Sequence, residues 1–487
     1  MSNNDKSIAI RGGIWTSIST AVTMLATMGR VMILTRFLAK SDFGLVSITN
    51  MVISLCATFT DLGFASVIMY KQKFTDREFS SLYWIQFLLF LLIYSVIAFL
   101  SPSIAYFYEE PVLSAILPIA ALSVVFQALG KLYDSVLQKK YLFKMLAFRN
   151  IISNLASMVL AVLLAWKGYG VYSLVYSTLL HVVIFNVWNF ISGIKIQKPK
   201  FMLDFRGAMP LIKIGIYQTG TRILDYFSGK LDVMIIGKLL GTEALGIYDL
   251  AKELVFRLVE FVRSVVSKVA LPILSNNNND DSAVRTRFLQ ITKTVAFLCI
   301  PICTTVAVFS KDIVSIMYGI NYIDVAPLVS IFAVITIFTS ISSFFDMLGI
   351  AKGRTDLNFI NTVCRILVTT PAIAVTSLIS IEAVAWGQLA VTLIMVVIFW
   401  FVVVQRTYPI SFKIYISQFD KLLLVSLMAA FVMVICVYVI DVFAFIDNWI
   451  FKFLLYFSVY AALFLSGAYI FIKDDISFFI NLVLKKK

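Results

Sequence analysis

The strongest constraint in this sequence is an internal repeat. Residues 10–46 align without a gap with residues 212–248, at a constant offset of 202 positions. The chain is also 60% hydrophobic and only 14% charged, and its mean hydropathy is +0.93. Duplicated helix bundles in a chain of this composition are typical of membrane transporters. Paired positions of the repeat include Gly13 and Gly215, Val31 and Val233, Arg36 and Lys238, and Gly44 and Gly246.

The apolar runs give the helix count. Hydropathy alone indicates twelve spans of membrane-crossing length. The repeat adds two more, at 209–236 and 243–271, which carry several charges and would otherwise be missed. We therefore predict an all-α polytopic membrane protein with 14 transmembrane helices, in two six-helix parallel repeats plus two C-terminal helices. The predicted parts are an N-terminal lobe at 1–200, a C-terminal lobe at 201–406, and two additional helices with a basic tail at 407–487.

Loop charges predict the orientation, because cytoplasmic loops of membrane proteins are enriched in Lys and Arg. On the fourteen-helix map, 26 of these residues fall on the side of the N-terminus and about five on the other. We therefore expect both termini to be cytoplasmic. The net charge of +14 is explained by these loops, so it does not indicate a nucleic-acid partner.

Several function classes are excluded or disfavoured by missing motifs. The sequence has no P-loop, nucleophile elbow or HExxH motif, and no catalytic residues are expected. Cys299 and Cys303 share a helix face, but no His or acidic residue joins them at ligand spacing, so no metal site is expected. His181 stands alone in a predicted span, where a packing histidine is favoured over a proton relay.

Polar stripes on the first, seventh and eighth predicted helices indicate a wet cavity. On the eighth helix, Glu253, Arg257 and Glu260 follow helical spacing, and Arg263 lies at the flank of this stripe. Each such charge would cost about 2.5 to 3.5 kcal/mol if it faced lipid. Transporters of this design place their sites near the midplane, where these residues are expected.

Arginines outnumber acids in this predicted cavity. Counting five arginines against Asp225 and Glu260 leaves a surplus of three positive charges, which suits a diphosphate, and guanidinium groups bind phosphate oxygens in a bidentate manner. Asp225, Glu260 and Asp61 are the candidate coupling or orienting acids. The alternative is that Arg222 with Asp225, and Arg257 with Glu260, are only structural pairs. The candidate substrate-binding residues are Arg30, Arg222, Arg257, Arg263 and Arg365.

Short motifs along nearly the whole chain resemble one known family. This is the polysaccharide-transporter branch of the multidrug/oligosaccharidyl-lipid/polysaccharide flippase superfamily, particularly its colanic-acid and teichuronic-acid-type exporters. The motifs are loose individually, and their order and spacing carry the resemblance. They are Gly13-Ile14-Trp15, Phe43-Gly44-Leu45, the segment from Asp61, Ser81 to Trp84, Leu137 to Lys144, Gly246 to Ala251, and Gly319 followed by Ala326-Pro327.

The resemblance implies a flippase that moves an undecaprenyl-diphosphate-linked oligosaccharide across the bacterial inner membrane during exopolysaccharide or lipopolysaccharide biosynthesis. Membrane lipids are implied partners, with a polysaccharide polymerase and glycosyltransferases as further candidates. No cofactor is expected, and coupling to protons or sodium is left open. The alternatives are a multidrug cation antiporter of the same superfamily, which the excess of arginines disfavours, a membrane-embedded glycosyltransferase or polymerase, and a scaffold that transports nothing.

Overall fold

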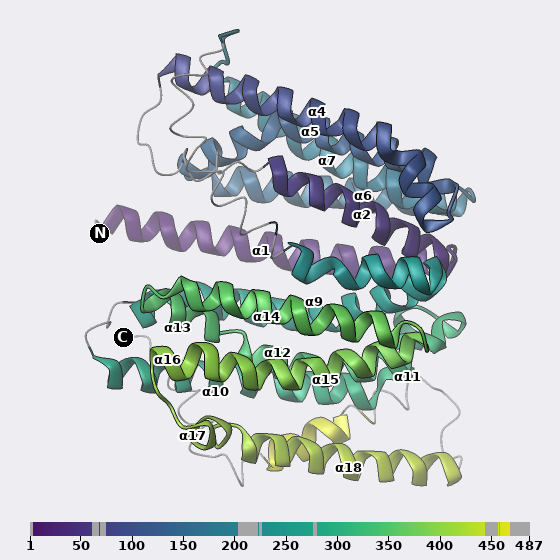
Figure 1. Cartoon of the computed structure of the whole chain (residues 1–487), viewed down its shortest axis with the longest axis vertical. Coiled ribbons are helices and arrows are strands. Elements are labelled where there is room, and N and C mark those ends of the chain that lie inside the picture. Colours follow the sequence, from purple (N-terminus) through teal and green to yellow (C-terminus); the bar gives the residue numbers. More distant parts are fainter. Residues whose placement is uncertain are drawn as a thin grey trace. The chain divides into compact units, whose positions relative to one another are not determined.

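The computed structural model describes residues 3–60, 68, 75–202, 223, 226–275, 280–443, 456 and 458–467. Every regular element in these residues is a helix. Ten of the described helices are long and apolar enough to cross a membrane. The chain divides into two compact units, Met1–Asp249 and Leu250–Lys487 (Figure 1). The structure is thus that of a polytopic membrane protein, while the count of fourteen helices and the lobe boundaries stay predictions.

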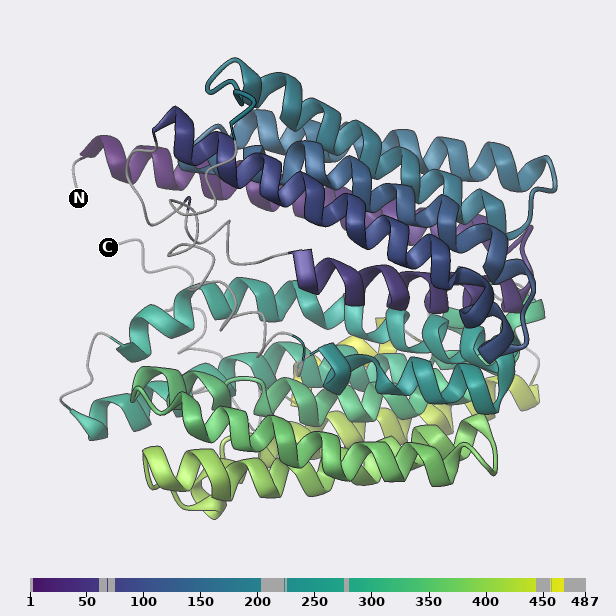
Figure 2. The same cartoon turned by 45° about the horizontal axis from the view of Figure 1, so that its top comes forward.

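The first unit is a bundle in which α5 packs against α4 and α7, and α6 packs against α1 and α7. Helix α2 also contacts α4, α5 and α7. These neighbours can be followed in Figures 1 and 2. The long helices of this unit are α1 (Asn3–Leu34), α2 (Lys40–Thr60), α4 (Asp76–Tyr108), α5 (Val112–Lys139), α6 (Phe143–Trp166) and α7 (Val171–Ile194). Residues 226–239 are helical too.

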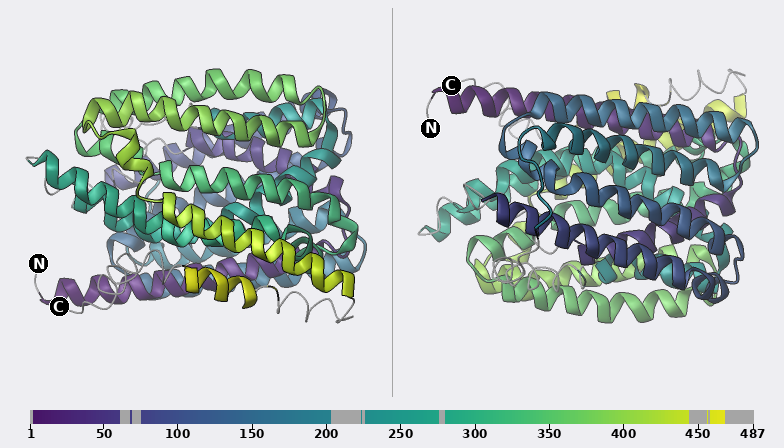
Figure 3. Two further views of the ribbon diagram at one scale, coloured as in Figure 1. Left: turned by 90° about the horizontal axis from the view of Figure 1, so that it is seen from below. Right: turned by 90° about the horizontal axis from the view of Figure 1, so that it is seen from above.

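In the second unit, α12 packs between α10 and α15, while α14 packs against α15 and α18 against α10. Figure 3 gives two further views of these helices. Helix α9 (Gly241–Ser275) begins in the first unit and continues into the second. The others are α10 (Asp281–Val308), α11 (Ser310–Met317), η1 (Ile320–Val325), α12 (Ala326–Ser342), α13 (Phe345–Ala351), α14 (Thr355–Thr376), α15 (Ile381–Phe399), η2 (Trp400–Val404), α16 (Gln405–Thr407), α17 (Phe412–Ile416) and α18 (Asp420–Phe443).

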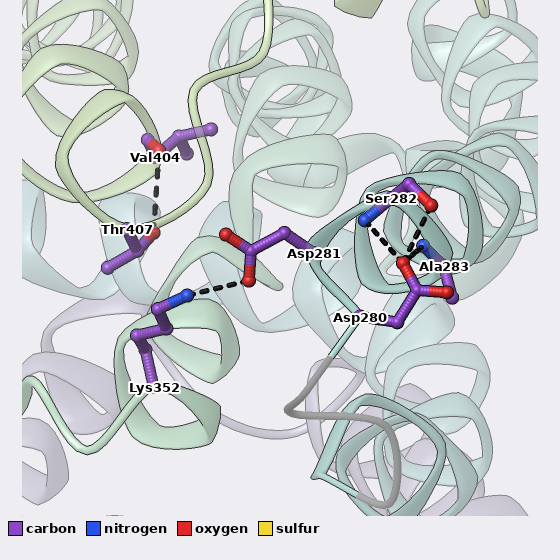
Figure 4. A network of polar contacts seen from close by, with 7 residues as sticks. All are labelled: Asp280, Asp281, Ser282, Ala283, Lys352, Val404 and Thr407. Atoms are coloured by element: carbon purple, nitrogen blue, oxygen red, sulfur yellow. Dashed lines mark hydrogen bonds and ion pairs between the residues drawn. The ribbon is translucent and has the colours of Figure 1, made fainter.

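Polar side chains determine where several helices begin. Thr75 and Glu78 form a capping box at α4, in which each side chain accepts a hydrogen bond from the backbone N–H of the other residue. Asp280 caps α10 by accepting from two backbone N–H groups of the first turn (Figure 4). Beside it, Asp281 forms an ion pair with Lys352 at 2.7 Å, which ties the end of α13 to the start of α10.

Helix α2 and the start of α9 cross closely inside the first unit, and their contact is reciprocal. Gly44 of α2 lies against the backbone carbonyl of Thr242, and Gly246 of α9 lies against the backbone carbonyl of Lys40. A Cβ atom at either glycine would overlap with that carbonyl oxygen. Positions 44 and 246 are one repeat apart, as are positions 40 and 242. A two-fold relation between the two repeats would produce reciprocal contacts of this kind.

Polar contacts reinforce this crossing. Ser47 Oγ donates a hydrogen bond to Asp249 Oδ2 at 2.5 Å, and these two residues are again one repeat apart. Four residues before Thr242, Lys238 forms an ion pair with Glu109 at 2.7 Å. The crossing therefore combines close backbone approach with polar side-chain contacts that join α2, α4, the helix at 226–239 and α9.

The repeat predicted α9 better than hydropathy did. The segment 243–271 was expected to be helical only because it corresponds to the second span, and the structure has one continuous helix of 35 residues there. At 1.5 Å per residue this helix is about 50 Å long, which exceeds the thickness of a hydrocarbon core. The segment 209–236 lies largely outside the described residues, so the seventh span stays a prediction there.

Candidate functional site

The middle of α9 carries the charged side chains that the sequence placed at the site. One side of the helix is apolar and buried, including Leu254, Val255 and Val259. The charged side chains retain exposure: 31% for Glu253, 38% for Arg257, 33% for Arg263 and 65% for Glu260. This division is what helical periodicity predicts for a helix that packs on one face and meets a polar medium on the other.

The ion pairs on α9 differ from the expected ones. Arg257 pairs with Glu253, four residues earlier, and its Nε donates to Glu253 Oε1 at 2.6 Å. Glu260, the expected partner of Arg257, lies instead 3.8 Å from Arg263. The alternative in which Arg257 pairs with Glu260 is therefore wrong for that pair. Both carboxylates are within one turn of Arg257 on the helix, and Arg263 competes for Glu260.

This pairing also changes the charge count of the predicted cavity. Glu253 belongs to the polar stripe and was not among the acids weighed against the five arginines. Including it lowers the surplus from three positive charges to two. The Glu260–Arg263 pair at 3.8 Å is longer than a direct charge-assisted hydrogen bond, so it leaves guanidinium donors of Arg263 for a ligand.

The other predicted site residues fall in three groups. Arg30 lies on α1, in the first unit, and its guanidinium donates to Ser157 Oγ of α6 at 3.3 Å. Arg365 lies on α14, in the second unit, and is exposed. Three of the predicted residues lie outside the described part of the chain: Arg222, Asp225 and Asp61.

Sequence reasoning missed a buried polar cluster in the first unit. Arg149 of α6, whose side chain is only 6% exposed, forms an ion pair with Asp134 of α5 at 2.7 Å. The same guanidinium group donates to Asn189 of α7, so one side chain joins three helices. The available signal was an arginine inside an apolar span.

No metal centre is apparent in the described residues, since no three His, Cys, Asp or Glu side chains are grouped there. Cys299 and Cys303 of α10 are buried and not joined by a disulfide. The chemistry available on α9 is therefore that of guanidinium and carboxylate groups held inside an otherwise apolar chain. Such groups bind anions and orient one another.

A family described as polysaccharide biosynthesis protein matches residues 33–327. Among curated proteins, the chain is 27% identical to the teichuronic acid biosynthesis protein TuaB of Bacillus subtilis, over 72% of each chain. It is 23% identical to the lipopolysaccharide biosynthesis protein WzxC of Escherichia coli, over 85% of this chain and 84% of that one.

Solved structures with the same architecture are transporters. The lipid II flippase MurJ, in an inward closed conformation, superposes with a TM-score of 0.72 at 19% identity, covering 96% of this chain and 100% of that one. A multidrug resistance MATE transporter in an inward-facing conformation gives a TM-score of 0.62 at 12% identity, over 78% of this chain and 93% of that one. At such low identity these likenesses show the fold alone.

Proposed function

We propose that this chain, which belongs to the polysaccharide biosynthesis protein family, is a flippase that moves a lipid-linked oligosaccharide across the bacterial inner membrane. It is a transporter rather than an enzyme. Relatives named for the biosynthesis of teichuronic acid and lipopolysaccharide support a glycan substrate, and the fold shared with a lipid II flippase supports a lipid-linked one. The multidrug antiporter shares that fold, but no contact in the described residues favours an organic cation.

The observation that carries this proposal is the charged face of α9. Membrane-spanning helices avoid charges unless they face a polar cavity or a partner. Arg257 is held by Glu253, which uses two of its three guanidinium nitrogens and leaves donors of the fork for a ligand. Arg263 is held only loosely by Glu260. Two arginines with donors to spare, six residues apart on one helix, suit a diphosphate bridging an isoprenoid and a glycan.

The roles of individual residues follow from these contacts. Arg257, Arg263 and Arg222, assisted by Arg30, hold the diphosphate, with Arg365 as a further candidate. Glu253 orients Arg257, a role that the sequence had given to Glu260. The candidate acids that orient the arginines or exchange a coupling cation remain Asp225, Glu260 and Asp61.

Transport by alternating access fits the crossing of α2 and α9. Its reciprocal contacts at Gly44 and Gly246 join the two repeats next to loops that the charge distribution predicts to lie outside the cell. We propose that the two six-helix lobes rock about a central cavity, so that this crossing must separate when the cavity opens outward. We also propose that the chain has fourteen transmembrane helices with both termini in the cytoplasm. The transported glycan is then delivered to a polysaccharide polymerase.

The test deletes the gene for this chain in its own bacterium and then reintroduces the wild-type gene or a variant. Deletion should remove the surface glycan and leave its lipid-linked precursor on the inner leaflet, and the wild-type gene should restore export. Arg257→Ala should lose a charge-assisted contact of about 1.5 to 3 kcal/mol and lower export, with normal protein abundance. Arg257→Lys should retain only part of the export activity, because lysine lacks the planar guanidinium fork.

A matched control distinguishes this role from structural pairing. Arg354 also forms an ion pair, with Asp356 at 2.9 Å, but lies at the start of α14. Arg354→Ala should leave export unchanged. If Arg257 serves only the helix, Arg257→Ala should lower abundance and the double variant with Glu253→Ala should restore both abundance and export. That recovery would contradict the proposed role of Arg257.

A further inference from the structure

A cavity of about 350 Å³ lies in the first unit between α5 and α7. The two helices run side by side (Figure 1). Polar side chains in a membrane-spanning bundle face the bundle interior or a water-filled space, because lipid cannot satisfy them. Five of the seven side chains that line this cavity are polar, namely Gln127, Lys131, Asp134, His181 and Asn186, and the other two are Val182 and Phe185.

Hydrogen bonds from residues outside the cavity lining hold the carboxylate of Asp134 in place. Asp134 Oδ1 accepts from Arg149 at 2.7 Å, and Asp134 Oδ2 accepts from Gln138 at 2.8 Å. Arg149 in turn lies over the ring of Phe185, with its guanidinium carbon 3.5 Å from the ring centroid. Asp134 keeps 25% of its side chain exposed. A neutralised acid and an aromatic ring are therefore held in place beside the cavity before any ligand arrives.

Several hydrogen-bonding groups of the lining are left for a ligand. The Gln127 side chain forms no hydrogen bond with the residues that the structure describes. Asn186 donates its amide to the carbonyl of Val182 at 2.8 Å, which leaves its side-chain oxygen as an acceptor. His181 Nδ1 is buried without a partner in this part of the chain. A buried polar group without a hydrogen bond is costly, so the lining is complementary to something polar.

The mixture of donors and acceptors distinguishes between ligand classes. A phosphate offers only acceptors, and the oxygens of Asp134 and Asn186 would repel it. An organic cation would be repelled by Lys131 and Arg149. Sugar hydroxyls both donate and accept, so they can donate to Asp134 and Asn186 while accepting from an amide or ammonium group. The volume is at the low end for small-ligand pockets, which suits one or two sugar rings.

We propose that this cavity is a sugar-binding subsite, which receives part of the glycan of the transported lipid. The inference rests on the proposed flippase function and adds a place for the glycan, formed by side chains of α5 and α7 that were not assigned to the diphosphate. Gln127, Lys131, Asp134 and Asn186 bind hydroxyl groups, and the Phe185 ring packs against the apolar face of the sugar. The subsite makes the affinity depend on the glycan as well as on the lipid.

The test compares two lipids on the full-length chain in lipid nanodiscs. One is the undecaprenyl-diphosphate-linked repeat unit extracted from the bacterium that carries this chain, and the other is sugar-free undecaprenyl diphosphate. The variants are Gln127→Leu and the double variant Gln127→Leu with Lys131→Met. The control is Gln86→Leu, because Gln86 is a buried glutamine of α4 outside the cavity lining.

The double variant should weaken binding of the glycan-bearing lipid about tenfold and leave binding of undecaprenyl diphosphate unchanged. The Gln86→Leu variant should bind both lipids as the wild type does. Equal weakening for both lipids would mean an anion site or a structural role and would overturn the proposal, as would unchanged binding of the glycan-bearing lipid. If the wild type bound neither lipid, the flippase function itself would fail, and the subsite with it.

Discussion

Replacing Gly44 with alanine should force α2 and α9 apart at their crossing. The new Cβ would overlap with the carbonyl oxygen of Thr242, which is rigid helical backbone and cannot rotate away. Overpacking of this kind costs about 1 to 3 kcal/mol. Because the cost falls only on the state in which the crossing is closed, the ratio of open to closed molecules should rise about 5-fold to 150-fold. Gly246→Ala, which meets the carbonyl of Lys40, should act in the same direction.

The assay measures how often the crossing opens. A cysteine at Ile48, a fully buried residue of α2 beside Gly237, is introduced into a variant without the native cysteines. Its rate of reaction with a membrane-impermeant maleimide added outside the cell should rise by the same factor in Gly44→Ala. The control is Gly229→Ala, because a Cβ at Gly229 meets nothing within 4 Å. Unchanged labelling in both Gly44→Ala and Gly246→Ala, at normal abundance, would refute the reasoning.

Two further predictions concern charged pairs of the first unit. Arg149→Ala should leave the half-buried Asp134 without its cationic partner, destabilise the packing of α5, α6 and α7, and lower membrane abundance on immunoblots. The double variant with Asp134→Asn should recover part of the lost abundance. Abundance that stays as low as in Arg149→Ala would count against the Arg149–Asp134 pair. The pKa of Glu109 lies below its ordinary 4.5, first because of its hydrogen bond to Lys238 and then because of that charge. The pair's contribution is therefore complete above pH 4.5 and lost as pH falls through the lowered pKa, so acid should raise labelling of the cysteine reporter relative to that of an exposed reference cysteine, since thiol protonation slows both reactions. Lys238→Gln should remove this pH dependence, and its persistence would argue against the pair.

The repeat made α9 predictable from sequence. The offset of 202 residues aligns 243–271 with the second apolar span. This alignment indicates a helix at 243–271, although its charged residues lower the hydropathy there. The same offset pairs Gly44 with Gly246, and the structure brings each of these glycines against a backbone carbonyl of the other helix. Helix α9 is predictable because it depends on periodicity and symmetry, which the linear sequence contains.

The ion pairs were less predictable, for two physical reasons. On a helix, Arg257 reaches an acid four residues before it and another three residues after it, so spacing alone cannot choose between Glu253 and Glu260. Arg149 and Asn189 are 40 residues apart, and only the packing of α6 against α7 brings them together. The cavity beside them depends on that packing, so residues such as Gln127 had no signal in the sequence that marked them.

The most direct test of the central claim is flipping by the purified chain. Liposomes are prepared with the native lipid-linked repeat unit in both leaflets, with or without the chain, and an impermeant periodate reagent oxidises the sugars it can reach. The account predicts that nearly all of the glycan becomes accessible when the wild-type chain is present, and only the outer-leaflet share when it is absent or carries Arg257→Ala. Accessibility that stays at the outer-leaflet share with the wild-type chain, while sugar-free controls show intact vesicles, would contradict the flippase function.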